Sequence, residues 1–361
     1  MRMNDLRADN LCVDKTSTAI HDGVAVSPVV RAGVVGAGLM GRWHASVIRR
    51  AGGRLVGVVD VDARASQRLA ARHHGAQSFT ALDRMLSEVG LDVLHICTPP
   101  STHDDLARQA INAGINTLVE KPLTPHAAET EQLLNLAAER RVRMCPIHQF
   151  LFQDGFLKAK KLLPRIGDVL HIAGTFCSAG GEGEPRQRLD SIVNDILPHP
   201  LSLMEALLPG CISGAQWMTV RPDSGEMRAF GEAAGLTLSI FISMNARPTV
   251  CSLQIIGTGG TIHLDLFHGY AFCEPGRVSR LMKVWRPFDL AFRRVSAASV
   301  NLGTRLARRE MAYPGLCRLV RTFYAATRTG GDAPISASAT LAVARVRDAL
   351  MNKSGGYPKH G

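Results

Sequence analysis

Apolar runs alternate with amphipathic segments along the first half of the chain. Short apolar runs bounded by glycine or polar residues predict buried strands, and apolar positions three and four residues apart predict helices. The predicted strands begin at Arg31 and then follow at Leu55–Asp60, Gln77–Phe79, Val93–Cys97 and Ile115–Glu120. The predicted helices lie around Trp43–Ile48, Ala63–His73 and Leu82–Glu88, from an N-cap at Ser101 to Gly114, and after Thr124-Pro125. Repeated strand–helix units of this kind require a parallel sheet with right-handed crossovers.

The pattern changes after Phe150. Four segments alternate between apolar and polar residues, as half-buried antiparallel strands do: Val169–Phe176, Leu236–Ile242, Ser252–Ile256 and Thr261–Leu264. The glycine-rich stretch 257–260 separates the last two and predicts a hairpin turn, since no helix follows it to form a phosphate cradle. Helical patterns return at Leu316–Arg328 and Ala339–Leu350.

These patterns predict an α/β fold with two domains, which the length of 361 residues accommodates. Residues 30–150 are predicted to form a Rossmann domain with a doubly wound parallel sheet. Residues 151–361 are predicted to form an α+β domain for substrate binding and oligomerisation, with a large, mainly antiparallel open sheet. Residues 1–29 carry charges throughout and no apolar run of signal-peptide or membrane-spanning length, so we expect a disordered leader there.

A glycine motif is the strongest chemical signal. The stretch Gly36-Ala37-Gly38-Leu39-Met40-Gly41 follows the first predicted strand and opens a helix, which is the context that a dinucleotide-binding G-x-G-x-x-G requires. Its first glycine permits a tight turn, its second lets the backbone approach a pyrophosphate, and its third allows close helix packing. The helix N-terminus then offers N–H groups and a positive dipole end to the phosphates.

Asp60 ends the second predicted strand, about 20 residues beyond the motif, where a carboxylate accepts hydrogen bonds from the adenosine ribose hydroxyls. A solvated carboxylate at a strand end is the alternative interpretation. A carboxylate at this point would repel a 2′-phosphate, which favours NAD. Arg64 could still pair with such a phosphate, so NADP is kept as the alternative cofactor.

Several motifs together resemble those of the Gfo/Idh/MocA family of oxidoreductases, over residues 30–350. In chain order they are Gly36–Gly41, Asp60, Thr98-Pro99-Pro100 with His103, Glu120-Lys121-Pro122, Asp195-x-x-x-His199 and Ile256-Gly257-Thr258-x-Gly260. The resemblance implies a nicotinamide cofactor in the Rossmann half. It also implies hydride transfer to or from a carbinol carbon of a sugar, cyclitol or nucleotide-sugar, and homodimers or homotetramers joined through the open face of the second sheet.

Further cofactor contacts follow from the resemblance. Thr98 and Pro99 come after the fourth strand, where the backbone would line the cofactor groove. His103, Glu120 and Gln149 are also candidates, with a capping-turn role as the alternative for His103. No metal site is predicted, because the cysteines and histidines do not have the spacing of zinc ligands.

The catalytic candidates are Lys121, His199 and Asp195. Hydride transfer from a carbinol carbon leaves a hydroxyl proton for a base, the reverse reaction needs an acid in the same place, and histidine can serve both near neutral pH. Asp195 could hold the His199 ring in one tautomer. Because prolines flank His199, this contact would pass through a turn into a helix that starts near Pro200.

Lys121 follows the fifth strand, at the sheet edge where open α/β folds bind ligands. The resemblance implies that its ammonium polarises the reacting oxygen and bonds the nicotinamide ribose. The alternatives are a surface lysine at a strand end and, for His199, a structural histidine. The sequence also departs from the family's Asp-x-Gly-x-His-x-x-Asp pattern, with Leu197 at the glycine and Ser202 at the second aspartate. The identity of the substrate is therefore not carried over.

The net charge of +11 is concentrated in one segment, because residues 277–309 hold nine basic residues and a single acid, Asp289. Apolar residues recur there at helical spacing, which would suit a membrane-surface helix, but Pro287 argues against one uninterrupted helix. The favoured interpretation is an insertion that packs its apolar side on the sheet or on a second subunit. A peripheral membrane contact with a lipid-linked substrate and an anionic partner such as a nucleotide-sugar diphosphate are the alternatives.

The remaining composition excludes several function classes. Eight cysteines scattered singly indicate a reducing compartment, and we expect a cytoplasmic protein. Nucleic-acid binding is disfavoured, because the basic residues form one block without a recognition motif. The predicted function is an NAD(P)-dependent dehydrogenase or reductase acting on CH–OH groups. A cofactor-binding regulator or scaffold without turnover is the alternative, since it would need only the glycine motif and Asp60.

Overall fold

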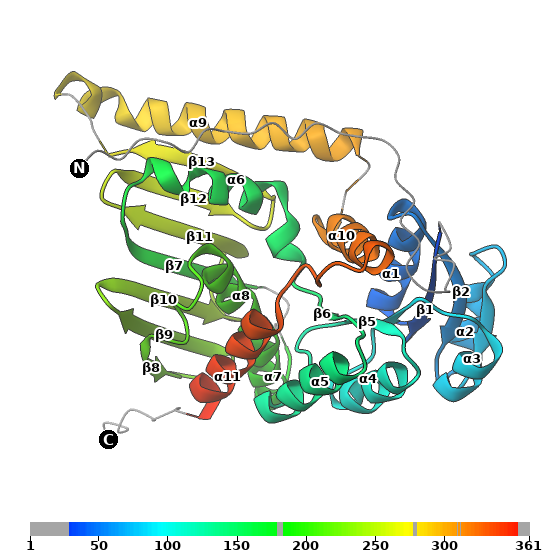
Figure 1. Ribbon diagram of the computed structural model, residues 1–361. Coiled ribbons are helices and arrows are strands. Elements are labelled where there is room, and N and C mark those ends of the chain that lie inside the picture. Colours follow the sequence, from blue (N-terminus) through cyan, green and yellow to red (C-terminus); the bar gives the residue numbers. More distant parts are fainter. Residues whose placement is uncertain (1–28, 179–182, 277–279, 309, 311, 353–361) are drawn as a thin grey trace, which may run out of the picture.

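The computed structural model describes residues 29–178, 183–276, 280–308, 310 and 312–352. Two sheets lie side by side within them, each with helices packed against it (Figure 1). Apart from Val29, the predicted leader 1–29 lies outside the described residues. Residues 179–182 and the start of segment 277–309 lie outside them as well.

The first sheet has six parallel strands in the order β3-β2-β1-β4-β5-β6. Its strands are β1 (Val30–Val35), β2 (Gly53–Val59), β3 (Gln77–Phe79), β4 (Val93–Ile96), β5 (Asn116–Val119) and β6 (Met144–Pro146). The connecting helices are α1 (Leu39–Arg50), α2 (Ala63–Ala70), α3 (Leu82–Glu88), α4 (His103–Asn112) and α5 (Ala127–Glu139). The strand order reverses between β1 and β4, where doubly wound sheets bind ligands at their carboxyl edge. The predicted Rossmann fold is confirmed.

The second sheet has seven strands in the order β13-β12-β11-β7-β10-β9-β8. Its strands are β7 (Val169–Cys177), β8 (Gln216–Val220), β9 (Glu226–Ala233), β10 (Leu236–Ser243), β11 (Val250–Gly257), β12 (Gly260–Asp265) and β13 (Tyr270–Pro275). Neighbours are antiparallel except β7 and β10, which pair in parallel. The predicted mainly antiparallel sheet and its hairpin at 257–260 are confirmed. The sequence patterns missed β8, β9 and β13, of which β8 and β13 are the half-exposed edge strands.

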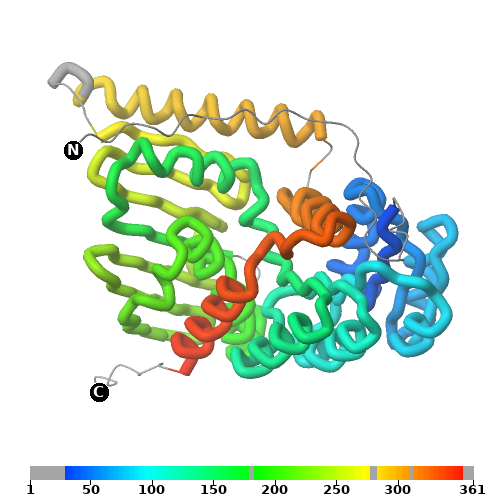
Figure 2. Tube along the Cα trace, in the orientation of Figure 1, coloured from blue at the N-terminus to red at the C-terminus, as the bar shows by residue number. Residues whose placement is uncertain are grey.

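Helices from the second half of the chain pack on both sheets. They are α6 (Asp154–Leu162), α7 (Arg186–Ile196), α8 (Pro198–Leu207), α9 (Arg280–Ala307), α10 (Leu316–Thr329) and α11 (Ala337–Asn352), with short 3₁₀ turns η1 (Pro100–Thr102), η2 (Gln149–Phe152) and η3 (Leu163–Arg165). α6, α8 and α11 contribute to the core of the second sheet. The trace in Figure 2 returns to the first sheet with α10, whose Leu319, Phe323 and Tyr324 are buried in that sheet's core. The domain boundary near residue 150 stays a prediction.

α9 is an uninterrupted 28-residue helix beside the edge strand β13 (Figure 1). The prediction that Pro287 interrupts it is wrong. Pro287 removes the N–H group that would donate to the Lys283 carbonyl, but Lys283 is exposed, so water can satisfy that oxygen. Among the described residues, no helix combines the length and apolar character needed to cross a bilayer.

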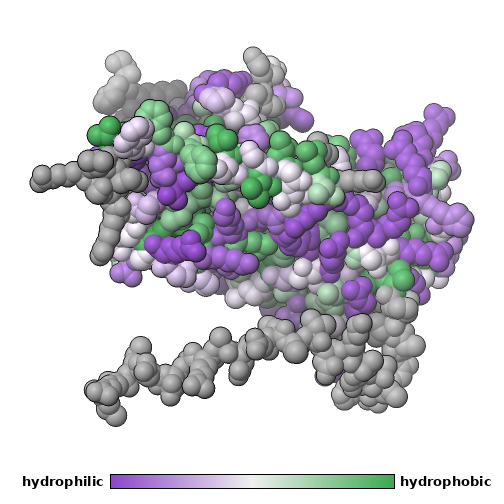
Figure 3. Space-filling view, turned by 90° about the horizontal axis from the view of Figure 1, so that it is seen from above, coloured by the Kyte–Doolittle hydropathy of each residue, from purple (hydrophilic) through white to green (hydrophobic). Residues whose placement is uncertain are grey.

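The apolar side of α9 points away from the sheet, so the interpretation that it packs on the sheet is wrong. Its large apolar side chains are 53% to 73% exposed: Val284, Trp285, Phe288, Phe292, Val295, Val300, Leu302 and Leu306. Figure 3 looks down on this surface and shows apolar side chains gathered along the helix. The polar side meets β13 and its preceding turn, where Arg286 bonds Glu274 at 2.5 Å and Asn301 donates to the His268 carbonyl at 2.7 Å. Packing on a second subunit stays a prediction.

The predicted start of the helix after β4 is wrong. Ser101 is not an N-cap, because it lies inside η1, and α4 begins two residues later at His103. The three residues of η1 begin with Pro100, whose fixed φ suits the first position of a helical turn.

Candidate active site

The glycine motif forms the turn between β1 and α1. Gly36 has a φ of +90°, and a Cβ there would lie 2.6 Å from the Cys97 carbonyl oxygen. A Cβ on Gly41 would lie 1.7 Å from the Gly36 carbonyl oxygen, whereas nothing lies within 4 Å of the Cβ position of Gly38. Packing therefore requires the first and third glycines, while the second leaves the backbone open to an approaching group.

The N-terminus of α1 faces this opening without a side-chain cap. Gly38 is the N-cap residue, and the first turn holds no acidic side chain. Leu39 is exposed and Met40 is half-buried. The first N–H groups of the helix have no intrahelical acceptor, so they and the helix dipole can bind an anion such as a pyrophosphate.

Asp60 lies directly beside the glycine turn. Its Oδ2 accepts a hydrogen bond from the Ala37 N–H at 2.7 Å, and its Oδ1 accepts one from the Asp62 N–H at 2.9 Å. Each carboxylate oxygen keeps a lone pair for a ribose hydroxyl. Arg64 is exposed in the first turn of α2, four residues away in sequence. The geometry fits the predicted adenosine-ribose contact.

His103 is buried and joins two loops at the carboxyl edge of the sheet. Its Nε2 lies 2.8 Å from the Thr98 carbonyl oxygen, and its Nδ1 lies 3.0 Å from that of Pro122. The ring thus ties the loop of Thr98 and Pro99 to the Glu-Lys-Pro loop. This geometry favours a positioning role for His103, and direct contact with the cofactor stays a prediction.

Glu120 starts a buried chain of polar groups. Its Oε1 lies 3.2 Å from His44 Nε2, and its Oε2 accepts a hydrogen bond from the Lys121 N–H at 3.2 Å. His44 Nδ1 then lies 2.7 Å from His95 Nδ1, and His95 Nε2 lies 2.7 Å from the Tyr324 hydroxyl. Burial and the neighbouring His44 lower the pKa of His95 well below its usual range. The sequence patterns missed this chain, although a histidine inside the apolar strand β4 is a signal of it.

Lys121 lies just beyond β5 and reaches across to α7, in the second half of the chain. Its Nζ donates a hydrogen bond to the Asp195 backbone carbonyl at 2.9 Å. This contact joins the Glu-Lys-Pro loop to the last turn of α7. The ammonium is half-buried and keeps further N–H donors for a ligand oxygen.

Two buried histidines stand close to this lysine. His199 lies in the first turn of α8, and His148 follows β6; the exposed fractions are 9% and 4%. Burial first, then the positive charge of Lys121, and then the neighbouring His148 lower the pKa of His199 well below its usual range. Burial and Lys121 lower the pKa of His148 to about 4, with Glu120 acting in the opposite direction. Among the described residues, neither Nδ1 atom has a hydrogen-bond partner.

The structure shows no hydrogen bond between the Asp195 carboxylate and His199, and the His199 Nδ1 has no partner among the described residues. Asp195 lies in the last turn of α7 and His199 in the first turn of α8, with Leu197 between the two helices. α8 starts at Pro198, and not near Pro200, because proline suits the first position of a helix. Burial raises the pKa of the Asp195 carboxyl, while Lys121 and Arg347 lower it.

Gln149 and Phe150 complete the surroundings of His199. Gln149 is buried at the start of η2, and the Phe150 ring centroid lies 4.6 Å from that of His199. His148 is the residue that sequence reasoning undervalued, since it singled out its neighbour Gln149 as the candidate. No cluster of three or more metal-ligating side chains occurs in the described part of the chain.

The first half of the chain matches a known family model. Residues 30–148 match the model described as an oxidoreductase family with an NAD-binding Rossmann fold, GFO_IDH_MocA. UDP-N-acetylglucosamine 3-dehydrogenase from Acidithiobacillus ferrooxidans is 36% identical over 148 residues, 37% of this chain and 46% of that protein. Inositol 2-dehydrogenase 4 from Saccharopolyspora erythraea is 39% identical over 133 residues, 36% of this chain and 37% of that protein. The aligned part thus spans less than half of each relative.

Solved structures extend the likeness over nearly the whole chain. The structure of UDP-N-acetylglucosamine 3-dehydrogenase GnnA from Acidithiobacillus ferrooxidans has a TM-score of 0.71 at 19% identity, covering 90% of this chain and 98% of that one. The WlbA dehydrogenase from Bordetella pertussis, in complex with NADH and UDP-GlcNAcA, also has a TM-score of 0.71, at 17% identity, covering 92% and 97%. At such identities these structures show that the fold is shared, and nothing more.

Proposed function

Because the chain belongs to the Gfo/Idh/MocA family of NAD(P)-binding oxidoreductases, we propose that it transfers a hydride between a nicotinamide cofactor and the CH–OH carbon of a sugar-like molecule. One observation carries the proposal. Lys121, His148 and His199 gather at the carboxyl edge of the first sheet, and burial together with their mutual charges perturbs the pKa of both histidines. The substrate class, a sugar, cyclitol or nucleotide-sugar, rests on the names of the relatives.

NAD is the cofactor that the described residues fit best. The open approach at Gly38 and the uncapped N-terminus of α1 suit a pyrophosphate. The Asp60 carboxylate suits ribose hydroxyls and disfavours a 2′-phosphate, so NAD is proposed over NADP. When bound, the nicotinamide ring supplies or accepts the hydride. The loop of Thr98 and Pro99, which His103 ties to the Glu-Lys-Pro loop, is proposed to line the groove for this ligand.

His199 is proposed to take the hydroxyl proton in the oxidation direction. Because its pKa lies well below the usual value, its ring is neutral at neutral pH and can accept a proton at a ring nitrogen. In the reduction direction the same nitrogen returns the proton. His148 is buried like His199 and lies near the charge of Lys121, and it is proposed to contact the reacting group through its unpartnered Nδ1.

Lys121 is proposed to bind the reacting oxygen. The Asp195 carbonyl holds its Nζ in place, and the ammonium stabilises negative charge that develops on that oxygen. Asp195 therefore acts on Lys121 through its backbone carbonyl. The Asp195 carboxylate also lies near the Lys121 ammonium and places a negative charge beside it.

The proposal includes a homodimer or homotetramer that joins through the uncovered face of the second sheet. Met218 and Phe230 are neighbours across β8 and β9 and are 64% and 42% exposed on that face. A second copy would cover them. Phe230→Glu should shift the protein towards monomer in analytical ultracentrifugation, and an unchanged mass would remove this interface from the proposal. A cytoplasmic location stays a prediction.

A second candidate function is favoured by α9. Its outward apolar stripe, with Trp285 and Phe288, suits the interface of a membrane, and the enzyme would then act on a lipid-linked saccharide. Phe288→Glu should abolish sedimentation with phosphatidylglycerol vesicles, while Leu170→Glu, at an exposed apolar position of β7 outside α9, should not. If the unaltered protein does not sediment with the vesicles, the membrane function is excluded and only the first candidate function remains.

The deciding experiment follows nicotinamide absorbance with NAD or NADP and a panel of sugars, cyclitols and nucleotide-sugars. Turnover that Lys121→Ala and His199→Ala abolish would support the dehydrogenase. Tight cofactor binding without turnover of any panel member would instead favour the regulator or scaffold.

A further inference from the structure

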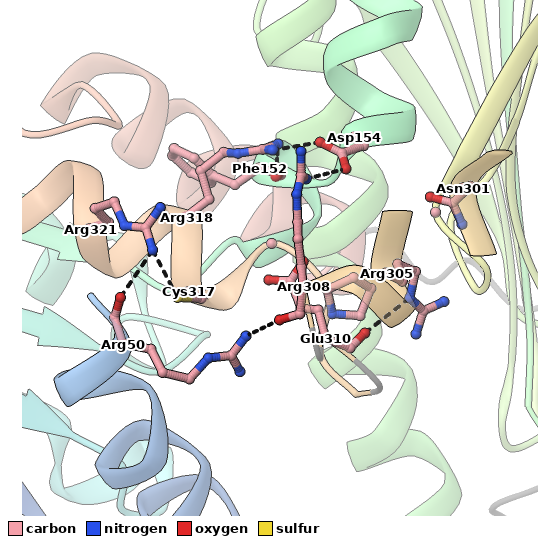
Figure 4. Close-up of a pocket in the computed structure, with 13 residues that line it drawn as sticks. Arg50, Phe152, Asp154, Asn301, Arg305, Arg308, Glu310, Cys317, Arg318 and Arg321 are labelled. Atoms are coloured by element: carbon pink, nitrogen blue, oxygen red, sulfur yellow. Dashed lines mark hydrogen bonds and ion pairs between the residues drawn. The ribbon is translucent and has the colours of Figure 1, made fainter. Parts of the chain in front are cut away.

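A second polar site lies outside the candidate active site. A cavity of about 470 Å³ opens where α1, α6, α9 and α10 meet. Five arginines line it, and we call them the arginine pocket: Arg50, Arg305, Arg308, Arg318 and Arg321 (Figure 4). Arg50 ends α1, and the other four lie more than 250 residues later, at the end of α9, just after it, and in α10. None of them belongs to the residues proposed above for catalysis or cofactor binding.

The acidic residues of this cavity do not balance its arginines. Asp154 and Glu310 are the two carboxylates among the lining residues. Asp154 pairs with Arg308 at 2.6 Å and with Arg318 at 2.5 Å. Figure 4 shows both guanidinium groups turned towards this carboxylate. The five guanidinium groups against two carboxylates leave a net positive cavity.

Two of the arginines are oriented by neutral groups. Arg50 donates a hydrogen bond to the Arg308 carbonyl at 2.8 Å, and Arg321 donates one to the Arg50 carbonyl at 3.0 Å. Neither has a carboxylate partner among the described residues. Backbone carbonyls fix the direction of a guanidinium without neutralising its charge, and each group has five N–H donors. The pocket is therefore built in advance for an anion.

The N-terminus of α10 adds to the positive field. Its N-cap, Gly315, lines the cavity, makes no side-chain cap, and is followed by a first turn without acidic residues. Gly315 has a φ of +92°, and a Cβ there would lie 2.3 Å from the Gln149 carbonyl oxygen. The close packing holds this helix end in place, with its positive dipole end at the cavity.

The pocket is separate from the site proposed for the cofactor's pyrophosphate. Arg50 ends α1, whereas the glycine motif begins it. At 1.5 Å per residue, the eleven steps from Leu39 to Arg50 span roughly 17 Å. One pyrophosphate cannot contact both ends of the helix.

We propose that the arginine pocket binds the phosphoryl group or groups of a small phosphorylated molecule. Guanidinium groups arriving from several directions match the oxygens of a tetrahedral anion, and their planar forks bond phosphate oxygens in pairs. The uncapped helix end offers backbone N–H groups to the same anion. The proposal goes beyond the dehydrogenase function and does not depend on it.

Inorganic pyrophosphate is the probe, titrated by calorimetry into the full-length protein in the presence and absence of saturating NAD. Binding should persist with NAD present, because the two sites differ. Arg50→Gln and Arg321→Gln should each weaken binding by about tenfold or more, as expected for the loss of a charge-assisted hydrogen bond. Arg49→Gln is the matched control, since Arg49 carries the same charge on the same turn of α1 but lines a different cavity.

Several results would overturn the proposal. Equal weakening by Arg49→Gln and Arg50→Gln would show attraction to general surface charge. Loss of binding when NAD is added would assign the pyrophosphate to the glycine motif. If Arg50→Gln lowers the melting temperature strongly, its effect on binding cannot be separated from misfolding, and the affinity of the Arg321→Gln protein is the test. Full affinity in a folded Arg321→Gln protein would also contradict the proposal.

Discussion

The candidate active site and the arginine pocket both contain several titratable side chains. The two sites differ in how deeply these side chains are buried and in the partners that they have. His148 and His199 are almost fully buried, and their Nδ1 atoms lack partners among the described residues. In the arginine pocket, Arg308 and Arg318 are 50% and 33% exposed and both pair with Asp154. Burial without partners makes a charge costly, whereas exposure and hydrogen bonds make it permanent.

The difference suggests why each arrangement suits its proposed task. A histidine that is costly to protonate stays neutral and can take a proton when the substrate offers one. Guanidinium groups that are always charged cannot move protons, but they can hold an anion without any change of state. Changes to the first site should therefore alter rates and pH dependence, and changes to the second should alter affinity.

The largest expected effect is on the rate. His199→Gln should lower kcat by about 10²–10⁴-fold, because the proposed general acid/base is lost. His74→Gln, which replaces an exposed histidine of the first domain, should leave kcat unchanged. Steady-state assays with the substrate found in the panel measure both. A kcat for His199→Gln within threefold of the unaltered protein would assign the proton transfer elsewhere.

The second expected effect is on the pH dependence of the free energy of unfolding. His148 has a pKa of about 4 in the folded protein and about 6.5 when unfolded, so the unfolded chain binds more protons between these values. The contribution of His148 to the free energy of unfolding is therefore complete above pH 6.5. As the pH falls to about 4, about 3 kcal/mol of this free energy is lost. Urea unfolding across this range should show a weaker pH dependence in His148→Gln than in His74→Gln. Equal slopes would contradict the dry environment of His148.

Much of the first sheet could be predicted because its signals are local. The bounds of β3 and α3 match the predicted ones, and the glycine motif, Asp60 and Lys121 each stand where an apolar run ends. The buried chain from Glu120 to Tyr324 could not be found in this way. His95 and Tyr324 are 229 residues apart and meet only because α10 packs back on the first sheet.

α9 shows another limit of sequence patterns. Helical periodicity identifies the residues that share a face, including Trp285, Phe288 and Phe292, but not which face meets the protein. Here the arginines turn inwards because β13 and its preceding turn offer Glu274, the Tyr270 hydroxyl and the His268 carbonyl. These partners are set by the tertiary fold.

A smaller effect links Lys121 to the buried histidines. Its charge is the second cause, after burial, of the low pKa of His199, so Lys121→Met should raise that pKa. The pKa should stay below 6.5, because burial remains. NMR titration of the His199 ring protons measures the change without requiring activity, with Lys158→Met as the control. A pKa that does not rise would mean that the ammonium does not act on His199.

The smallest expected change in stability belongs to the arginine pocket. Asp154→Asn removes the carboxylate shared by Arg308 and Arg318, both partly exposed, and should alter the free energy of unfolding by less than about 1 kcal/mol for each pair. The same substitution frees two guanidinium groups, so pyrophosphate should bind more tightly, and added salt should reduce the gain. Calorimetry at two ionic strengths measures this. Weaker binding in a folded Asp154→Asn protein would mean that Asp154 holds the arginines in place more than it competes with the anion.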